Sequence, residues 1–168
     1  AGAMGIPQFL PSSYRRFALD FDGDGKRDLW RTPADAIGSV ANYYKSYGWR
    51  VGEPIVVLAE VGETDVEDII AAGIKPHLKV VELLKQGVTL PAPVAEDAEA
   101  ALFMVESDGG PQYWLGLNNF YVITRYNRSV NYALAVYELA RELRALVKPG
   151  LTSEKSPINA NKINPQRP

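Results

Sequence analysis

The sequence contains no cysteine and only one histidine, His77. Without cysteine the chain can form no disulfide, supply no thiolate nucleophile and build no cysteine-ligated zinc site. A single histidine also excludes a cage of several imidazoles, and it leaves room for a Ser-His-Asp triad only if His77 itself serves. Because His77 follows Lys75 and Pro76, its position favours the capping of a loop.

The chain also has no large excess of charge of one sign. Its 18 Lys and Arg stand against 20 Asp and Glu, which gives a net charge of −2. Proteins that bind nucleic acids neutralise phosphates with clustered Lys and Arg, so we exclude a nucleic-acid partner. There is no run of about twenty apolar residues and no signal-peptide pattern, so we expect no membrane span in this sequence.

What remains is an ordinary globular composition. The chain has 168 residues, of which 46% are hydrophobic and 23% charged. These values fit one domain with a real core, or one domain with a small appendage.

Residues 20–28 are the most informative stretch and read Asp-Phe-Asp-Gly-Asp-Gly-Lys-Arg-Asp. Carboxylates at alternate positions followed by glycine at the sixth position are typical of a calcium loop of EF-hand type. The expected ligands are the side chains of Asp20, Asp22 and Asp24, the backbone carbonyl of Lys26, and Asp28 directly or through water.

The loop departs from the standard pattern at its twelfth position, where Arg31 replaces the bidentate Glu. The nearest carboxylate downstream is Asp35, in the first turn of the next predicted helix, and it could complete the site if the loop is longer than usual. The alternative is an acidic, Gly-rich surface turn without an ion. The motif also leaves open whether the ion is Ca²⁺ or Na⁺, and a bound ion by itself identifies no reaction.

Capping residues and periodicity predict the secondary structure. The helix after the loop should begin with Thr32 as its cap and Asp35 completing a capping box, and Ile37, Val40, Ala41 and Tyr44 should form its core face. The expected helices are 14–19, 33–48, one opened by a capping box at 64–67 and ended by Gly73, 78–85, 118–127 and 129–147; the expected strands are 55–58 and a hairpin of 101–106 with 112–117.

Four stretches together resemble one family. They are Ala-Gly-Ala-Met-Gly-x-x-Gln-Phe-x-Pro-Ser-Ser-Tyr at residues 1–14, the Asp-Phe-x-Gly-Asp-Gly loop that runs into Leu29-Trp30, Asp-Ala-Ile-Gly-Ser-Val-Ala-Asn-Tyr at 35–43, and residues 121–127. This combination is similar to the MltB-type (family 3, Slt35-like) membrane-bound or soluble lytic murein transglycosylases of bacterial cell walls. The resemblance covers roughly residues 1–147.

The resemblance implies an α+β, mainly helical fold that contains part of a lysozyme-like transglycosylase domain. We expect a lysozyme-like core with the cation loop over 1–52, a small α+β insertion over 53–117, return helices of the core over 118–149, and an extended tail over 150–168. It also implies an EF-hand-like loop with longer spacing and a late Asp, which aligns with Asp35, and a structural rather than catalytic ion.

The implied reaction cuts the bond between N-acetylmuramic acid and N-acetylglucosamine in peptidoglycan without adding water. A single Glu acts first as acid and then as base, and a 1,6-anhydro ring closes on the muramyl sugar. In this family that Glu lies upstream of the residue 1–14 motif, so we expect no catalytic residue in this chain. Glu60 and Glu106 are carboxylates that could replace it, but no motif supports either.

The chain should therefore contribute the substrate groove. The residues that match groove positions of the family are Gln8, Tyr43, Tyr121, Tyr126 and Asn127. The apolar, Gly-rich residues 1–10 suggest a chain that begins within a domain, so we expect an N-terminal partner chain of the same protein that carries the catalytic Glu. The implied location is the bacterial periplasm, with a parent that is either soluble or anchored to the outer membrane as a lipoprotein.

Two other hypotheses stay open at this point. One is a cation-stabilised fragment that binds peptidoglycan without cutting it, which a companion chain carrying a Glu would argue against. The other is an EF-hand-type interaction module, which should contain a second paired loop, and none is visible in the sequence.

Overall fold

The computed structural model describes residues 2–147. The chain divides into two compact units, residues 1–133 and residues 134–168. The extended tail expected over 150–168 lies outside the described residues.

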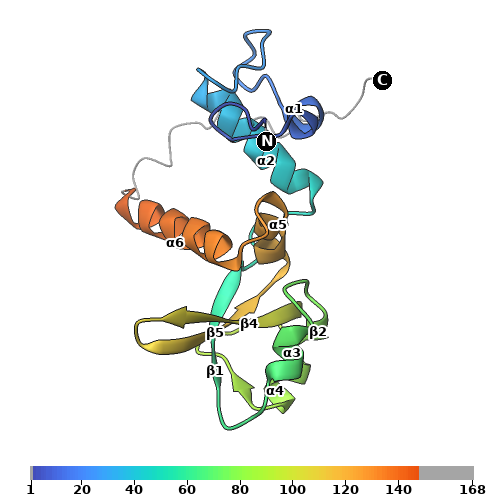
Figure 1. Cartoon of the computed structure of the whole chain (residues 1–168), viewed down its shortest axis with the longest axis vertical. Helices are drawn as coiled ribbons and strands as arrows, with labels where there is room; N and C mark the ends of the chain where they lie inside the picture. Colours follow the sequence, from blue (N-terminus) through green and yellow to red (C-terminus); the bar gives the residue numbers. More distant parts are fainter. Residues whose placement is uncertain (1, 148–168) are drawn as a thin grey trace. The chain divides into compact units, whose positions relative to one another are not determined.

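The described part contains both helices and strands (Figure 1). The helices are α1 (Pro11–Phe17), α2 (Pro33–Ser46), α3 (Glu67–Ala71), α4 (Val80–Lys85), α5 (Asn118–Tyr126) and α6 (Val130–Leu146). The strands are β1 (Val56–Val61), β2 (Leu78–Lys79), β3 (Val88–Thr89), β4 (Glu99–Ser107) and β5 (Gly110–Gly116). Every predicted helix and strand has a counterpart, with boundaries that shift by a few residues. The two shortest strands, β2 and β3, were not predicted.

The strands form one antiparallel sheet in the order β2-β4-β5-β1-β3. The predicted hairpin is confirmed: β4 pairs with β5 along its length, and Ser107 faces Gly110 across the turn. Gly110 has φ +99°, a backbone conformation that glycine adopts without steric cost. Leu102 and Leu115 of this hairpin pack with Val80 and Leu83 of α4 in a buried core beside the sheet.

A second core is built from aromatic rings. We call it the aromatic cluster: Phe9, Phe17 and Tyr43, with the partly buried Tyr14, Tyr44, Tyr47 and Tyr126 around them. Its rings come from the N-terminal loop, α1, α2 and α5. The edge of the Phe17 ring meets Tyr43 with 4.9 Å between centroids, a favourable geometry for aromatic pairs.

The predicted core face of α2 was right for Val40 and Tyr44, which are partly buried against the aromatic cluster, and wrong for Ile37 and Ala41, which are exposed. Ile37 is 70% exposed, whereas Tyr43 is only 7% exposed. The buried side of α2 instead presents polar side chains to the chain that crosses it: Ser39 Oγ accepts the backbone N–H of Leu19 at 2.9 Å, and Asn42 Nδ2 donates to the carbonyl of Phe17 at 3.0 Å. Helical periodicity alone could not reveal this, because residues that bind a crossing backbone are polar.

The predicted capping boxes at the starts of α2 and α3 were wrong too. Thr32 and Val66 are the N-cap residues, and neither makes a side-chain cap hydrogen bond. Asp35 does not return to Thr32 because its carboxylate binds backbone N–H groups of the preceding loop. The helix predicted over 78–85 also begins later, because Leu78 and Lys79 pair with β4.

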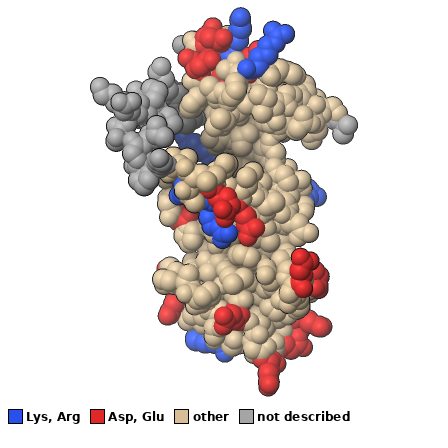
Figure 2. Space-filling view, turned by 90° about the vertical axis from the view of Figure 1, so that its left-hand side faces the viewer, with Lys and Arg blue, Asp and Glu red and all other residues tan. Residues whose placement is uncertain are grey.

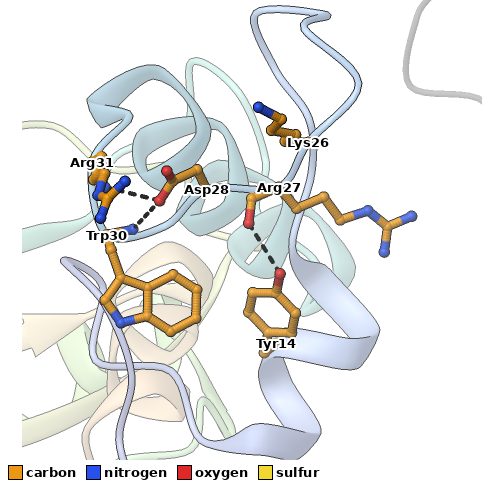
Figure 3. Close-up of a pocket in the computed structure, with 6 residues that line it drawn as sticks. All are labelled: Tyr14, Lys26, Arg27, Asp28, Trp30 and Arg31. Atoms are coloured by element: carbon orange, nitrogen blue, oxygen red, sulfur yellow. Dashed lines mark hydrogen bonds between the residues drawn. The ribbon is translucent and has the colours of Figure 1, made fainter.

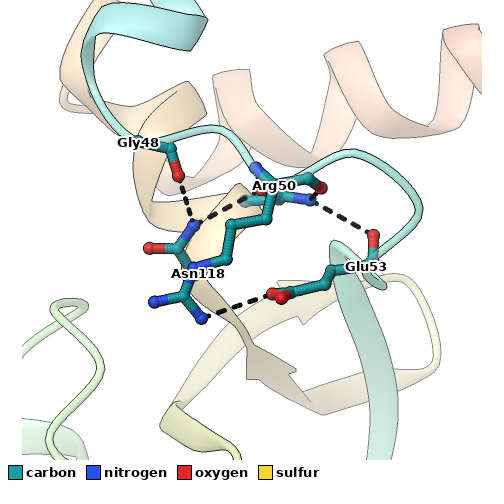
Figure 4. A network of polar contacts seen from close by, with 5 residues as sticks. Gly48, Arg50, Glu53 and Asn118 are labelled. Carbon is teal, nitrogen blue, oxygen red and sulfur yellow. Dashed lines mark hydrogen bonds and ion pairs between the residues drawn. The ribbon is translucent and has the colours of Figure 1, made fainter.

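Asn119 joins the start of α5 to the segment that follows α2. Its Oδ1 accepts the backbone N–H of Arg50 at 2.8 Å, and its Nδ2 donates to the carbonyls of Arg50 at 2.7 Å and Glu53 at 3.2 Å. Figure 4 shows the surrounding network, in which Asn118 donates to the carbonyl of Gly48 and the side chains of Arg50 and Glu53 form an ion pair. Asn119 is 1% exposed, so three backbone groups depend on one buried amide.

None of the helices within residues 2–147 combines the length and the apolar character needed to cross a bilayer.

Candidate functional site

The loop between α1 and α2 gathers carboxylates. Asp20, Asp22 and Asp35 each offer an oxygen atom, and these atoms lie within 4.8 Å of one another. The three residues differ in environment, since Asp22 is exposed and Asp35 is 1% exposed. Convergent carboxylate oxygens are the ligands that hard divalent cations prefer.

Asp35 holds both ends of the loop. Its Oδ1 accepts the backbone N–H of Phe21 at 2.7 Å, and its Oδ2 accepts that of Asp28 at 2.8 Å. A carboxylate oxygen has a further lone pair, so each oxygen keeps the capacity to bind a cation. The donor set therefore fits a calcium ion.

Asp20 organises the turn itself. Its Oδ1 accepts the backbone N–H groups of Gly23 at 2.7 Å and Asp24 at 3.1 Å, and its Oδ2 accepts that of Gly25 at 2.9 Å. Desolvation opposes ionisation of Asp20, but these N–H groups outweigh it and lower the pKa of the carboxyl group. Gly23 and Gly25 have φ of +82° and +89°, which explains why glycine suits both positions.

Two other expected ligands point elsewhere. Asp24 Oδ1 accepts the backbone N–H of Lys26 at 2.8 Å. Asp28 Oδ1 accepts those of Trp30 and Arg31, each at 3.0 Å (Figure 3). Neither Asp24 nor Asp28 belongs to the group of converging carboxylates. The structure thus brings together Asp20, Asp22 and Asp35, and the roles of Asp24, Lys26 and Asp28 stay predictions.

The N-terminal loop is folded back on itself. Met4 and Phe9 exchange two backbone hydrogen bonds, at 2.8 and 3.0 Å. At its tip Gln8 has φ +51°, the one positive φ of a non-glycine residue in the described part of the chain. The Gln8 side chain is exposed, and its Nε2 donates to the carbonyl of Gly5 at 2.9 Å. That bond supports the loop and leaves the amide oxygen available.

One tyrosine of α5 anchors this loop, and a second tyrosine, in α2, joins α2 to α5. Tyr126 donates its hydroxyl to the carbonyl of Pro7, and Tyr43 donates its hydroxyl to the carbonyl of Arg125 at 2.6 Å. The rings of Tyr43 and Tyr126 lie 5.1 Å apart between centroids, and the ring of Phe9 packs against both, 6.0 Å from each centroid. Burial, with a smaller contribution from Tyr47, raises the pKa of Tyr43 to about 12, and burial also raises the pKa of Tyr126.

The last two expected groove residues lie at α5. Tyr121 is half-buried, with the guanidinium of Arg125 5.9 Å from its ring centroid. Asn127 is exposed just after the helix, and its Oδ1 accepts the backbone N–H of Ser129 at 3.1 Å. Gln8, Tyr43 and Tyr126 thus meet around Phe9, which sequence reasoning passed over as a site residue although it follows Gln8 in the motif.

The two glutamates considered as acids lie on the sheet. Glu60 is on β1 and Glu106 on β4, and both are exposed. Neither belongs to the aromatic cluster or to the carboxylate group.

Comparison with known proteins identifies the family. The model of the Transglycosylase SLT domain family matches residues 1–141. The membrane-bound lytic murein transglycosylase B of Escherichia coli (strain K12) is 45% identical over 141 residues, which cover 84% of this chain and 38% of that protein.

Solved structures of similar proteins support the same family. The soluble lytic transglycosylase SltB1 from Pseudomonas aeruginosa superposes with a TM-score of 0.80 at 49% identity, over 86% of this chain and 48% of that chain. The Escherichia coli lytic transglycosylase Slt35, solved in complex with calcium, has a TM-score of 0.73 at 44% identity, over 84% of this chain and 44% of that chain.

The chain thus spans less than half the length of these relatives. Its fold is the lysozyme-like transglycosylase fold, with both helix and strand content. The resemblance noted from the motifs is confirmed, and the chain belongs to the Transglycosylase SLT domain family of lytic murein transglycosylases.

Proposed function

We propose that this chain is part of a peptidoglycan lytic transglycosylase. The enzyme cleaves the bond between N-acetylmuramic acid and N-acetylglucosamine without water and leaves a 1,6-anhydromuramic product. The chain supplies the glycan groove, and the catalytic Glu lies in the portion upstream of this chain. In that portion one carboxyl group protonates the leaving oxygen and then, as a carboxylate, helps the muramyl hydroxyl to close the ring.

The observation that carries the proposal is the junction around Phe9. Tyr126 and Pro7 are bonded although 119 residues separate them, and the Gln8 turn is held beside Tyr43. Motif residues from both ends of the family match are therefore neighbours in space, as a common binding surface requires.

Each expected groove residue then has a role that its surroundings support. Gln8 and Asn127 are exposed amides that can bond to acetamido or hydroxyl groups of a sugar. Tyr121 and Tyr126 offer half-buried rings to the apolar faces of pyranoses. Tyr43 would support the groove without contacting the sugar through its hydroxyl, because that hydroxyl already donates to the carbonyl of Arg125.

We further propose that residues 20–35 form an EF-hand-like loop that binds Ca²⁺ as a structural ion. The carboxylates of Asp20, Asp22 and Asp35 would bind the ion, with Asp24, the Lys26 carbonyl and Asp28 completing its shell. The calcium complex of the similar Slt35 supports Ca²⁺ over Na⁺. The ion would fix the loop that spans from α1 to α2.

The family resemblance also supports a division of the chain into a core and an insertion. We propose that residues 1–52 and 118–149 belong to a mainly helical lysozyme-like core and that 53–117 form an α+β insertion.

An apolar hollow of about 430 Å³ on the core includes Ile6, Ile37, Val40 and Tyr44, and Ile6 is 56% exposed. We propose that the portion carrying the catalytic Glu covers this face. The enzyme would act in the periplasm, its parent being either soluble or anchored as a lipoprotein.

Digestion of purified peptidoglycan sacculi tests the proposal. The 168-residue chain should bind sacculi but release nothing alone, and it should yield 1,6-anhydromuropeptides when combined with the upstream portion of its parent. Gln8→Asn introduces a residue that tolerates positive φ but shortens the side chain by one methylene group, which withdraws the amide from the groove. The rate of sacculi cleavage should therefore fall about tenfold or more. Gln112→Asn, on an exposed position of β5, is the matched control and should leave the rate unchanged.

Two outcomes would reject the proposal. One is a combined sample that leaves the sacculi intact, which would favour a binding fragment without catalysis. The other is product with a hydrolysed, non-anhydro muramyl end, which would identify a different reaction.

A further inference from the structure

A pocket of about 550 Å³ lies at the junction of α1 and the cation loop. It is lined by Tyr14, Lys26, Arg27, Asp28, Trp30 and Arg31 (Figure 3). None of these residues is among the five proposed for the groove. Asp28 and the Lys26 carbonyl have a proposed role at the ion, but the function proposed above gives no role to the side chains of Tyr14, Lys26, Arg27, Trp30 and Arg31.

The floor of the pocket is aromatic. Trp30 is 54% exposed, an unusual state for so large an apolar side chain. Its ring lies 5.9 Å from that of Tyr14, at an interplanar angle of 51°. The Tyr14 hydroxyl donates to the carbonyl of Arg27 at 3.0 Å, so the floor is fixed to the loop above it. Such a surface suits the apolar face of a pyranose ring.

The rim of the pocket is cationic. Lys26, Arg27 and Arg31 are exposed, and neither of the ion pairs found in residues 2–147 includes them. Asp28 contributes the one carboxylate of the lining, and one of its oxygens is occupied by the backbone N–H groups of Trp30 and Arg31. The lining therefore carries three positive charges against one negative charge, in a chain whose net charge is −2.

The figures show how these charges are placed. In Figure 3 the side chains of Arg27 and Arg31 extend to opposite sides of the pocket, with Trp30 and Tyr14 between and below them. In Figure 2 acidic and basic side chains lie side by side at the top of the view, over the loop between α1 and α2. The two cationic side chains therefore flank the aromatic floor from opposite sides, Arg31 on the side of Trp30 and Arg27 on the side of Tyr14.

We infer that this pocket binds a pyranose that carries a carboxylate, with the sugar ring on Trp30 and the carboxylate paired with Arg27 or Arg31. A guanidinium binds a carboxylate through two parallel hydrogen bonds, which a neutral sugar cannot accept in the same way. N-acetylmuramic acid is one sugar of this class. The inference stands on the pocket itself and does not depend on whether the parent cleaves peptidoglycan.

Two sugars that differ in one group provide the test. N-acetylmuramic acid carries a lactyl carboxylate that N-acetylglucosamine lacks. Each would be titrated into the full 168-residue chain with saturating Ca²⁺, while the indole N–H signal of Trp30 is followed by NMR. Substitution Trp30→Phe assigns that signal among the three tryptophans. We expect N-acetylmuramic acid to shift it and to bind about tenfold more tightly than N-acetylglucosamine, as one charge-assisted contact would give.

A double variant tests the cationic rim. Arg27→Gln with Arg31→Gln should weaken binding of N-acetylmuramic acid about tenfold and leave the affinity for N-acetylglucosamine unchanged. The matched control is Arg15→Gln with Arg128→Gln, which removes the same charge from exposed positions outside the pocket. Equal affinity for the two sugars, no shift of the Trp30 signal, or equal loss in both double variants would each overturn the inference. Sacculi cleavage is measured separately, so the two proposals can fail independently.

Discussion

The carboxylate of Asp35 accepts the backbone N–H of Phe21 at 2.7 Å, across 14 residues of sequence. Its other oxygen accepts the N–H of Asp28, so one buried side chain closes the loop at both ends. The loop is therefore organised by a residue of the following helix, and a cation would add to a framework that these hydrogen bonds already provide.

Replacing Asp35 should damage the loop even without a cation. Asp35→Asn keeps one oxygen acceptor but turns an NH₂ group toward a backbone N–H. We expect the free energy of unfolding to fall by about 1–3 kcal/mol, because a buried donor loses its partner. Thermal unfolding in the presence of a chelator measures this.

Asp22→Asn is the matched control for that variant. Asp22 is exposed, and its Oδ1 accepts the N–H of Asp24 at 3.2 Å, a bond that Asn can keep. It should unfold like the unmodified chain in chelator and lose affinity for Ca²⁺. If both variants unfold like the unmodified chain in chelator, the structural role given to Asp35 is incorrect.

Calcium should raise thermal stability through the same loop. A ligand that binds only the folded state stabilises it by about 2.7 kcal/mol at a concentration of 100 Kd. Calorimetric scans with Ca²⁺ and with chelator should therefore differ for the unmodified chain and agree for Asp20→Asn combined with Asp22→Asn. A chain that shows no difference between the two conditions would contradict the proposed ion site.

Gly38 should not accept a methyl group. A Cβ on Gly38 would lie 2.5 Å from the ring of Phe21, which is closer than real Cβ contacts. Gly38→Ala should displace Phe21 and weaken Ca²⁺ binding, although alanine normally favours a helix by about 1 kcal/mol. Isothermal titration with Ca²⁺ measures the effect.

Gly62→Ala serves as the comparison, because a Cβ there meets no atom within 4 Å. Its Ca²⁺ affinity should match that of the unmodified chain. An unchanged affinity in Gly38→Ala would show that Phe21 can move without disturbing the ligands.

Asn119 should be far more sensitive to substitution than its neighbour. Asn119→Ala removes a hydrogen bond from the N–H of Arg50, from its carbonyl and from the carbonyl of Glu53, and the carbonyl of Arg50 keeps only a long bond of 3.4 Å from the N–H of Glu53. We expect the free energy of unfolding in chemical denaturation to fall by about 2–4 kcal/mol, since three backbone groups lose their bonds to one buried amide together. Asn118→Ala removes a bond of 2.8 Å to the carbonyl of Gly48 and a longer one of 3.4 Å to Asn119 Oδ1, both from a half-buried residue, and should cost about 1 kcal/mol. Similar losses in the two variants would refute this assignment.

Stability should fall at alkaline pH. The pKa of Tyr43 and that of Tyr44 are raised from 10.0 to about 12, mainly by burial. The folded state therefore holds these protons more tightly, so their contribution is complete below pH 10 and is lost as the pH rises from 10 to about 12. Denaturation midpoints across that window, with tyrosinate absorbance as a second readout, measure the effect. Tyr43→Phe should show a shallower decline, and an identical decline would contradict the role of burial.

Much of the molecule followed from local sequence. Alternating carboxylates with glycine at the sixth position identified the loop, because ligand spacing is a local property of the chain. The turn at Asp108 and Gly109 between two strand patterns predicted the hairpin of β4 and β5, and four short motifs identified the family.

Tertiary structure decided which residues of those motifs meet. The sequence offered Asp24, Asp28 and Asp35 as further ligands beside Asp20 and Asp22, and only the path of α2 across the loop brings Asp35 to them. Periodicity also assigned the exposed Ile37 and Ala41 to the core face of α2. It could not reveal that Ser39 and Asn42 bind a crossing backbone.

The hydrogen bond from Tyr43 to the carbonyl of Arg125 was likewise not predictable from local sequence, because the two residues are 82 positions apart. The spacing of residues along the chain can be read from the sequence, so the loop, the hairpin and the family could be predicted from it. Contacts between distant residues depend on how packed elements share their buried polar groups, and only the folded structure determines those.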